Sequence, residues 1–274
     1  MNSLRASRLT YLVLGLFTAV SLFPLVWTAV AASRTSTRLA QTPPPFWFGG
    51  NLGRNLTVAW NDANMGTALL NTVVVAGTVA AGTVLFSTLA GFAFARLRFR
   101  GRRLLLMLVV ATMLIPPQLS VVPLYMLIAK LSWTDQLQSV ILPSLVSAFG
   151  VFFMRQYLTQ VLPAELVEAA RVDGASSLRI VWHVVFPAAR PAMAVLGMLT
   201  FVMAWNDFFW PIVALTQNGS PTVQVALTGL GRGYIPDQSV IMAGALLGTL
   251  PLLLVFVVFG RQIVGGIMQG AIKG

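Results

Sequence analysis

The residues that could do chemistry gather in one charged segment of an otherwise apolar chain. From Glu165 to Pro187 it reads ELVEAARVDGASSLRIVWHVVFP, and it holds the only histidine of the sequence, His183. The absence of cysteine excludes disulfides, thiolate nucleophiles and cysteine-bound metals. No nucleophile–base pair or metal-ligand cluster accompanies His183, which is interpreted as a packing or surface residue. The segment is therefore interpreted either as a polar linker between spans or as a docking surface for a partner, and not as a catalytic site.

A protein that moves a solute needs an energy source, and the sequence carries none of its own. A phosphate-binding loop has the form G-x-x-x-x-G-K-[ST], but the only lysines, Lys130 and Lys273, lie outside any such context. Ion-coupled transport usually leaves ionisable residues within the spans, and this chain offers one good case, Asp207. We therefore expect a transport subunit whose energy is supplied by another chain. It is not expected to be an enzyme or to have a catalytic, cofactor or metal site.

The composition places most of the chain in lipid. Hydrophobic residues make up 57% and charged residues 9% of the 274 residues, whereas a soluble domain carries roughly a quarter charged residues. The net charge of +11 could suggest nucleic acid. However, the basic residues form short clusters beside apolar runs, which is typical of the cytoplasmic flanks of membrane spans. The sequence thus predicts a multi-pass membrane protein in contact with lipid, with no nucleic-acid partner.

Six apolar segments approach or exceed the length that crosses a bilayer. They cover residues 9–32, 69–94, 104–128, 137–154, 192–215 and 240–259. Because a backbone in hydrocarbon must satisfy its own hydrogen bonds, these segments are expected to be helices of an all-α fold in a single domain, 1–274. The first segment exceeds the usual apolar length of a signal peptide, so an uncleaved span is favoured. Prolines 116, 117, 123 and 143 predict kinks in the third and fourth spans.

The basic residues orient these spans. With the N-terminus in the cytoplasm, thirteen of the eighteen Lys and Arg residues lie on the inner side, most visibly in ARLRFRGRR at 95–103. Both termini are then cytoplasmic. The charged segment, which lies between the fourth and fifth spans, is also cytoplasmic.

The charged segment predicts two short helices with a turn between them. Pro163 suits a first helical turn, and Glu168 lies early enough to favour the helix N-terminus. Gly174 ends this helix, and Ser176 or Ser177 caps a second one. In the second helix Leu178, Val181, Trp182 and Val185 have the spacing of one apolar stripe. Pro187 and Pro191 are expected to end it before the fifth span.

These residues resemble a family motif. Glu168-Ala169-Ala170, three residues, Gly174, nine residues and then Val184-x-Phe186-Pro187 look like the EAA loop of ABC-importer permeases. The family pattern has Ile and Leu where this chain has Val184 and Phe186, and both replacements are apolar. Leu70-Asn71-Thr72, Ala204 to Phe208 and the tail ending in Gly274 resemble the carbohydrate-importer, MalG-like branch. SAFGVFFMRQYL and RQIVGGIMQG resemble actinobacterial cellobiose-type permeases.

The resemblance implies a MetI-like fold in a bacterial cytoplasmic membrane and a set of partners. These are a second, MalF-like permease chain, two cytoplasmic ATPase subunits that use ATP and Mg²⁺, and an extracytoplasmic sugar-binding protein. The loop at 162–188 would be the coupling element. Its predicted contact residues are Glu168, Ala169, Ala170, Asp173, Gly174, Leu178, Val181, Trp182 and Pro187.

The sequence predicts Asp207 well inside the fifth span, where an acid beside aromatic residues could contact sugar hydroxyls and ring faces. The residues predicted for passage or gating are Trp205, Asn206, Asp207 and Trp210. The alternatives are a hydrogen bond between helices and an acid near the outer interface that reaches lipid headgroups, and a structural or gating role is favoured over sugar contact. For the whole chain, the predicted function is the permease of an ATP-driven importer for a di- or oligosaccharide or a sugar derivative. An ion-gradient-driven secondary transporter or channel, and a non-transporting scaffold, are the alternatives.

Overall fold

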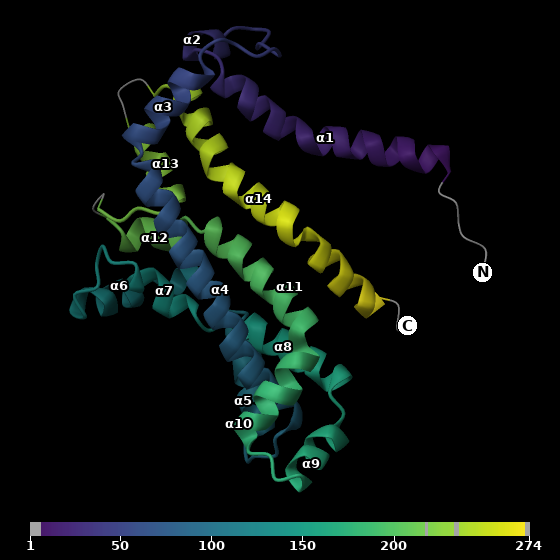
Figure 1. The fold of residues 1–274 in the computed structure, drawn as a ribbon. Coiled ribbons are helices and arrows are strands. Elements are labelled where there is room, and N and C mark those ends of the chain that lie inside the picture. The colour runs from purple at the N-terminus through teal and green to yellow at the C-terminus, as the bar shows by residue number, and fades with distance from the viewer. Residues whose placement is uncertain (1–6, 217–218, 233–235, 272–274) are drawn as a thin grey trace. The chain divides into compact units, whose positions relative to one another are not determined.

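The computed structural model describes residues 7–216, 219–232 and 236–271 (Figure 1). Every regular element within these ranges is a helix, which confirms the all-α prediction. Arg5, Lys273 and the end of the tail at Gly274, used above for orientation and resemblance, lie outside the described residues. By its contacts the chain divides into two compact units, formed by residues 1–68 with 223–251 and by residues 69–222 with 252–274.

The first unit contains α1 (Arg8–Ala32), α2 (Ser36–Leu39), α3 (Leu52–Asp62), α13 (Val223–Leu230) and the start of α14 (Gln238–Ala271). Its small core joins Ala32, Ala59, Val240 and Ala243. Ser36 and Ser239 both donate hydroxyl hydrogen bonds to Asp237 Oδ1, so that Asp237 ties α2 to the first turn of α14. The most apolar part of α1 has no buried residue, and it therefore presents its side chains outward.

The second unit is built around α4 (Met65–Arg96), which begins at the end of the first unit. Its other helices are α5 (Arg102–Thr112), η1 (Pro117–Ser120), α6 (Val121–Lys130), α7 (Gln138–Ser144), α8 (Ala148–Val161), α9 (Ala164–Val172), α10 (Ser177–Ile180), the π-helix η2 (Val181–Val185), α11 (Phe186–Trp205) and α12 (Phe209–Ala214). One core gathers buried residues of α4, α8, α9, η2 and α11, including Phe92, Leu158 and Val185. A second core joins α4 to α6, α7 and α12 through Val75, Ile128 and Trp210.

Five helical stretches within the described ranges are long and apolar enough to span a membrane, and a sixth is counted only if a bent pair is taken as one span. The bent pair corrects the predicted span 104–128. Residues 102–112 and 117–130 are separate helices that meet at 94°. The reason is local, since a residue before proline avoids the helical region and Pro116, before Pro117, has an extended ψ of 127°.

The fifth predicted span, 192–215, does not coincide with one helix. The helical stretch begins at Ser177, within the charged segment, and ends at Trp205, and α12 follows as a separate short helix. The fourth span extends beyond its prediction to Val161 and is interrupted between α7 and α8. The first and second predictions coincide with α1 and α4, and the sixth lies within the first part of α14.

Candidate coupling hairpin

The first helix of the charged segment, α9, ends in the turn that its glycine predicts. Gly174 has a φ of +77°, which is in the left-handed region. Its N–H donates to the carbonyl of Arg171 at 3.0 Å, and the next N–H, of Ala175, donates to the carbonyl of Ala170 at 2.9 Å. These two bonds form a Schellman motif, which satisfies the last carbonyls of a helix. The helix–glycine–helix prediction is confirmed.

The second helix does not stop at its prolines. Ser176 caps it by accepting a hydrogen bond from the N–H of Arg179 at 3.4 Å, and the helical backbone then runs through α10, η2 and α11 to Trp205. Pro187 occupies the second position of α11, directly after the π-helical turn, and Pro191 lies inside α11. The prediction that these prolines end the helix is wrong. A first helical turn tolerates proline, and a wider π turn relaxes the hydrogen-bond register before it.

The predicted apolar stripe is divided between two environments. Val181 and Val185 are buried in the core shared with α4, α8 and α9, together with Val167 of α9. Leu178 and Trp182 are 71% and 59% exposed. A π turn holds more residues than an α turn, so Val185 rotates toward the side of Val181 instead of continuing the line of Leu178 and Trp182. The segment therefore has one face on its own spans and one apolar face outward.

The outward apolar face is pre-ordered. Leu178 and Trp182 are four residues apart, which places them one above the other on a helix. The Trp182 ring meets Phe186 edge-on, with ring centroids 4.8 Å apart. An exposed, ordered tryptophan beside a leucine is typical of the anchors of protein interfaces.

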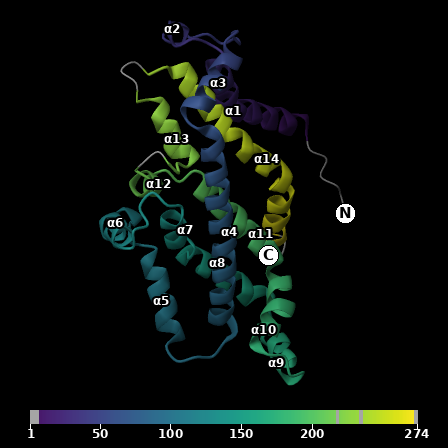
Figure 2. The ribbon, with the colours of Figure 1, turned by 60° about the vertical axis from the view of Figure 1, so that its left-hand side comes forward.

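Beside this face, α9 and the connection that follows α4 enclose a hollow of about 390 Å³. Glu168 and Arg171 line it from α9, Arg96 lines it from the end of α4, and Arg98 lines it from the connection. The Arg96 guanidinium donates to the carbonyl of Thr159 at 2.8 Å, near the end of α8. Figures 1 and 2 show α9, α10 and the α4–α5 connection at the same end of α4.

The other predicted contact residues lie on or near this hollow and the glycine turn. Glu168, Ala169 and Asp173 are exposed, and Ala170 is half-buried. Arg96 and Arg98 were not predicted as site residues. The distribution of basic residues could have indicated them, because it places ARLRFRGRR on the same side of the membrane as the charged segment.

The predicted passage residues are not equivalent. Trp205 is buried, and Trp210 donates its indole N–H to the carbonyl of Ser139 at 2.9 Å. Asn206 donates its amide to the carbonyl of Val202 at 2.8 Å. Asp207 lies not within a span, as predicted, but in the break between α11 and α12, where it lines a cavity.

Comparison with known proteins shows similarity over nearly the whole chain. A family model described as "Binding-protein-dependent transport system inner membrane component" matches residues 85–267. The lactose transport system permease protein LacG of Rhizobium radiobacter is 30% identical, over 96% of this chain and 95% of the relative. The arabinooligosaccharides transport system permease protein AraQ of Halalkalibacterium halodurans is 31% identical, over 93% and 92%.

A third relative is the sn-glycerol-3-phosphate transport system permease protein UgpE of Yersinia enterocolitica, 31% identical over 90% of this chain and 91% of the relative. Among solved structures, a chain of a bacterial ABC transporter involved in the import of the acidic polysaccharide alginate superposes with a TM-score of 0.79. The match covers 94% of this chain and 99% of that chain at 22% identity. The fold is therefore shared.

Proposed function

Because the chain belongs to the family of inner membrane components of binding-protein-dependent transport systems, we propose that it is the permease of an ABC importer for a sugar or sugar derivative. The relatives support this cargo class, since their names assign them to transport systems for lactose, arabinooligosaccharides and sn-glycerol 3-phosphate. All three cargoes are polyhydroxy compounds. A di- or oligosaccharide fits the family members that carry sugars, and the cellobiose-type branch stays a prediction.

The coupling hairpin is the proposed site of ATPase contact. Its outward pair, Leu178 and Trp182, belongs to the same continuous helical stretch as Trp205. A force applied to this pair therefore acts on the fifth span directly, without a flexible link. This continuity is the observation that carries the proposed mechanism, in which closure of two partner ATPase subunits moves the span between inward and outward openings.

The proposed complex contains four further kinds of component. They are a second permease chain, two ATPase subunits that bind ATP and Mg²⁺, an extracytoplasmic sugar-binding protein and the surrounding lipid. The hollow between Glu168 and the arginines Arg96, Arg98 and Arg171 would receive polar side chains of the ATPase. With the orientation that the basic residues predict, both termini of the chain lie in the cytoplasm.

Reconstitution of the complex with its cognate partners in proteoliposomes tests this function. We expect ATP-driven sugar uptake that a hydrolysis-dead ATPase abolishes. Glu168→Lys should reduce both uptake and copurification of the ATPase, because it replaces the only acid of the hollow. Glu165→Lys is the matched control, since Glu165 lies on the same helix but does not line the hollow. Uptake driven by an ion gradient without the ATPase would instead support a secondary transporter.

A further inference from the structure

Two interruptions of the helices in the second unit line the same cavity. One separates α7 from α8 at residues 145–147, and the other separates α11 from α12 at residues 206–208. The cavity is about 640 Å³, with Ser144 and Ser147 at the first interruption and Asp207 at the second. At membrane depth, irregular backbone is tolerated only where it is buried in protein or lines a water-filled space. Both breaks converge on one cavity, and water in this cavity would satisfy their backbone groups.

The hydroxyl groups at the first interruption are held in place and keep hydrogen-bonding capacity. Thr83 of α4 donates to the carbonyl of Ser144 at 3.3 Å, and Ser144 donates to the carbonyl of Val140 at 3.0 Å. Ser147 accepts the N–H of Gly150 at 3.2 Å. A hydroxyl has one donor and two acceptor positions, so Ser144 and Ser147 have acceptor positions beyond the bonds described, while the fully buried Thr83 holds Ser144 in place. Their positions are fixed by the ends of the helices.

Eight of the thirteen residues that line the cavity are apolar, and two further polar side chains and one aromatic ring stand among them. Thr200 and Asp207 line the cavity from α11 and the break after it, and Phe149 lines it from α8. A carboxylate accepts hydrogen bonds from sugar hydroxyls strongly, and an aromatic ring offers an apolar face to the C–H side of a sugar ring. A volume of about 640 Å³ lies within the range of small-ligand sites.

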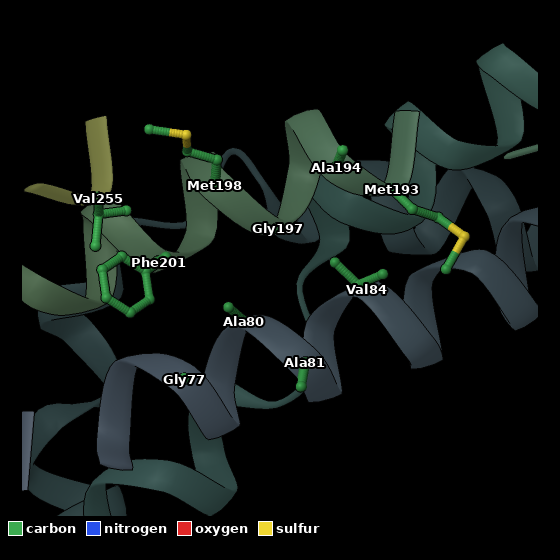
Figure 3. A pocket seen from close by; sticks show the side chains of 10 residues that line it. All are labelled: Gly77, Ala80, Ala81, Val84, Met193, Ala194, Gly197, Met198, Phe201 and Val255. Atoms are coloured by element: carbon green, nitrogen blue, oxygen red, sulfur yellow. The ribbon is translucent and has the colours of Figure 1, made fainter. Parts of the chain in front are cut away.

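The same helices also line a second cavity. It is about 450 Å³ and lies between α4 and α11, with Ala80, Ala81 and Val84 facing Gly197 and Met193 (Figure 3). None of the residues that line it carries a polar side chain. Thr83 and Thr200 therefore lie on one side of α4 and α11, while the opposite side is apolar. Lipid or an apolar helix suits the second cavity, and an aqueous solute suits the first.

We propose that this chain contacts the transported sugar directly, through the hydroxyl groups and the carboxylate of the first cavity. We name this site the polar cavity and define it by Thr83, Ser144, Ser147, Phe149, Thr200 and Asp207. The inference rests on the proposed function of sugar import and adds to it the contact surface on this chain. Of the passage residues that the sequence predicted, Asp207 is the one that belongs to the polar cavity.

The first test measures access of water and needs no knowledge of the cargo. Since the chain has no cysteine, single cysteines report on one position each. In the reconstituted complex, Ser144→Cys and Thr200→Cys should react with a water-soluble methanethiosulfonate at least about tenfold faster than Ala81→Cys, which lines the apolar cavity. Rates equal to that of Ala81→Cys would overturn the inference.

The second test measures sugar contact. Uptake of radiolabelled lactose, arabinobiose and sn-glycerol 3-phosphate is followed for Thr200→Val and Asp207→Asn. We expect the half-saturating concentration of a transported cargo to rise about tenfold, or the preference among cargoes to change by that factor, because a hydrogen bond to the sugar is lost. Thr18→Val is the matched control, since it makes the same substitution in α1 at a residue that does not line the polar cavity.

The outcomes of these tests distinguish a failure of this inference from a failure of the proposed function, sugar import. ATP-driven uptake by the wild type, with unchanged half-saturation and preference in both variants, would overturn the inference and leave the proposed function intact. An assembled wild-type complex that moves none of the three cargoes would count against sugar import and against the inference with it. Protection of Ser144→Cys by the transported sugar, with unchanged ATPase copurification in Thr200→Val, would support both.

Discussion

The N–H of Ala175 donates a hydrogen bond to the carbonyl oxygen of Ala170 at 2.9 Å, across the turn that Gly174 makes. Ala170 and Ala175 both pack against the core that contains Val167 and Ile180. The turn therefore fixes the angle between α9 and the long helical stretch that begins at Ser177. A Cβ on Gly174 would meet no atom within 4 Å. Glycine is therefore required here for its left-handed backbone conformation and not because a side chain would clash.

We predict that Gly174→Val disrupts coupling while Gly174→Asn largely preserves it. A branched residue in the left-handed region costs about 1–2 kcal/mol, whereas asparagine visits this region more readily. ATPase copurification and uptake should therefore fall in the order Gly, Asn, Val. Thermal unfolding of the purified chain serves as a control for global stability. Equal activity of the two variants would show that the turn geometry is not needed.

A second prediction separates the two faces of the coupling hairpin. Trp182→Ala should leave the melting temperature of the chain nearly unchanged, because the side chain is 59% exposed, but weaken ATPase binding by about tenfold or more. Val185→Ala should do the reverse, since Val185 has no exposed surface and loss of buried methyl groups costs about 1–3 kcal/mol. Arg179→Ala, an exposed change on the same helix, is the control.

Pull-down of the ATPase and thermal unfolding in detergent check this pair of variants. A large loss of stability in Trp182→Ala, or unchanged ATPase binding, would contradict the outward role of the tryptophan.

The sequence predicted features of the coupling hairpin that depend on neighbours in the chain. Gly174 needed only its place after an alanine-rich helix, and Ser176 only its place before the next helix. The division of the apolar stripe could not be predicted in this way. Whether Leu178 and Val185 share a face depends on the π turn between them and on the core that receives Val185.

The polar cavity could not be predicted from the sequence either, because its residues are far apart in the chain. Thr83, Ser144 and Thr200 are separated by many residues, and in the sequence each is a single hydroxyl residue within an apolar segment. Their common role appears only because two helix breaks converge in the fold. The bend after α5 was foreseen as a kink at prolines, but its angle of 94° was not, since proline permits many geometries.

A third prediction concerns the crossing of α4 and α8 beneath the coupling hairpin. A Cβ on Gly91 would lie 2.7 Å from the backbone nitrogen of Arg155, so Gly91→Ala must push two helices apart. We expect it to lower stability by about 1–3 kcal/mol. Gly77→Ala, in the same helix with no atom within 4 Å, should be neutral or raise stability by about 0.5–1 kcal/mol. Unfolding of both variants in detergent measures the difference, and similar values would refute the close crossing.

The last prediction concerns acid and the start of α14. Burial alone would raise the pKa of Asp237, but hydrogen bonds from Ser239, Ser36 and the N–H of Val240 outweigh it and hold the pKa below its ordinary value. A carboxylate with a lowered pKa in the folded state stabilises the fold above the pKa of the unfolded chain, near pH 4. This contribution is lost as the pH falls through the lowered folded value.

Asp237→Ala should therefore cost about 0.5–2 kcal/mol at neutral pH, the range for a lost helix cap, and less at pH 3. Melting curves of the purified chain between pH 3 and pH 7 test this dependence. Asp237→Asn keeps a capping oxygen without the charge and should show a smaller loss that changes little with pH. A difference between wild type and Asp237→Ala that stays constant from pH 7 to pH 3 would show that the charge of Asp237 does not stabilise α14.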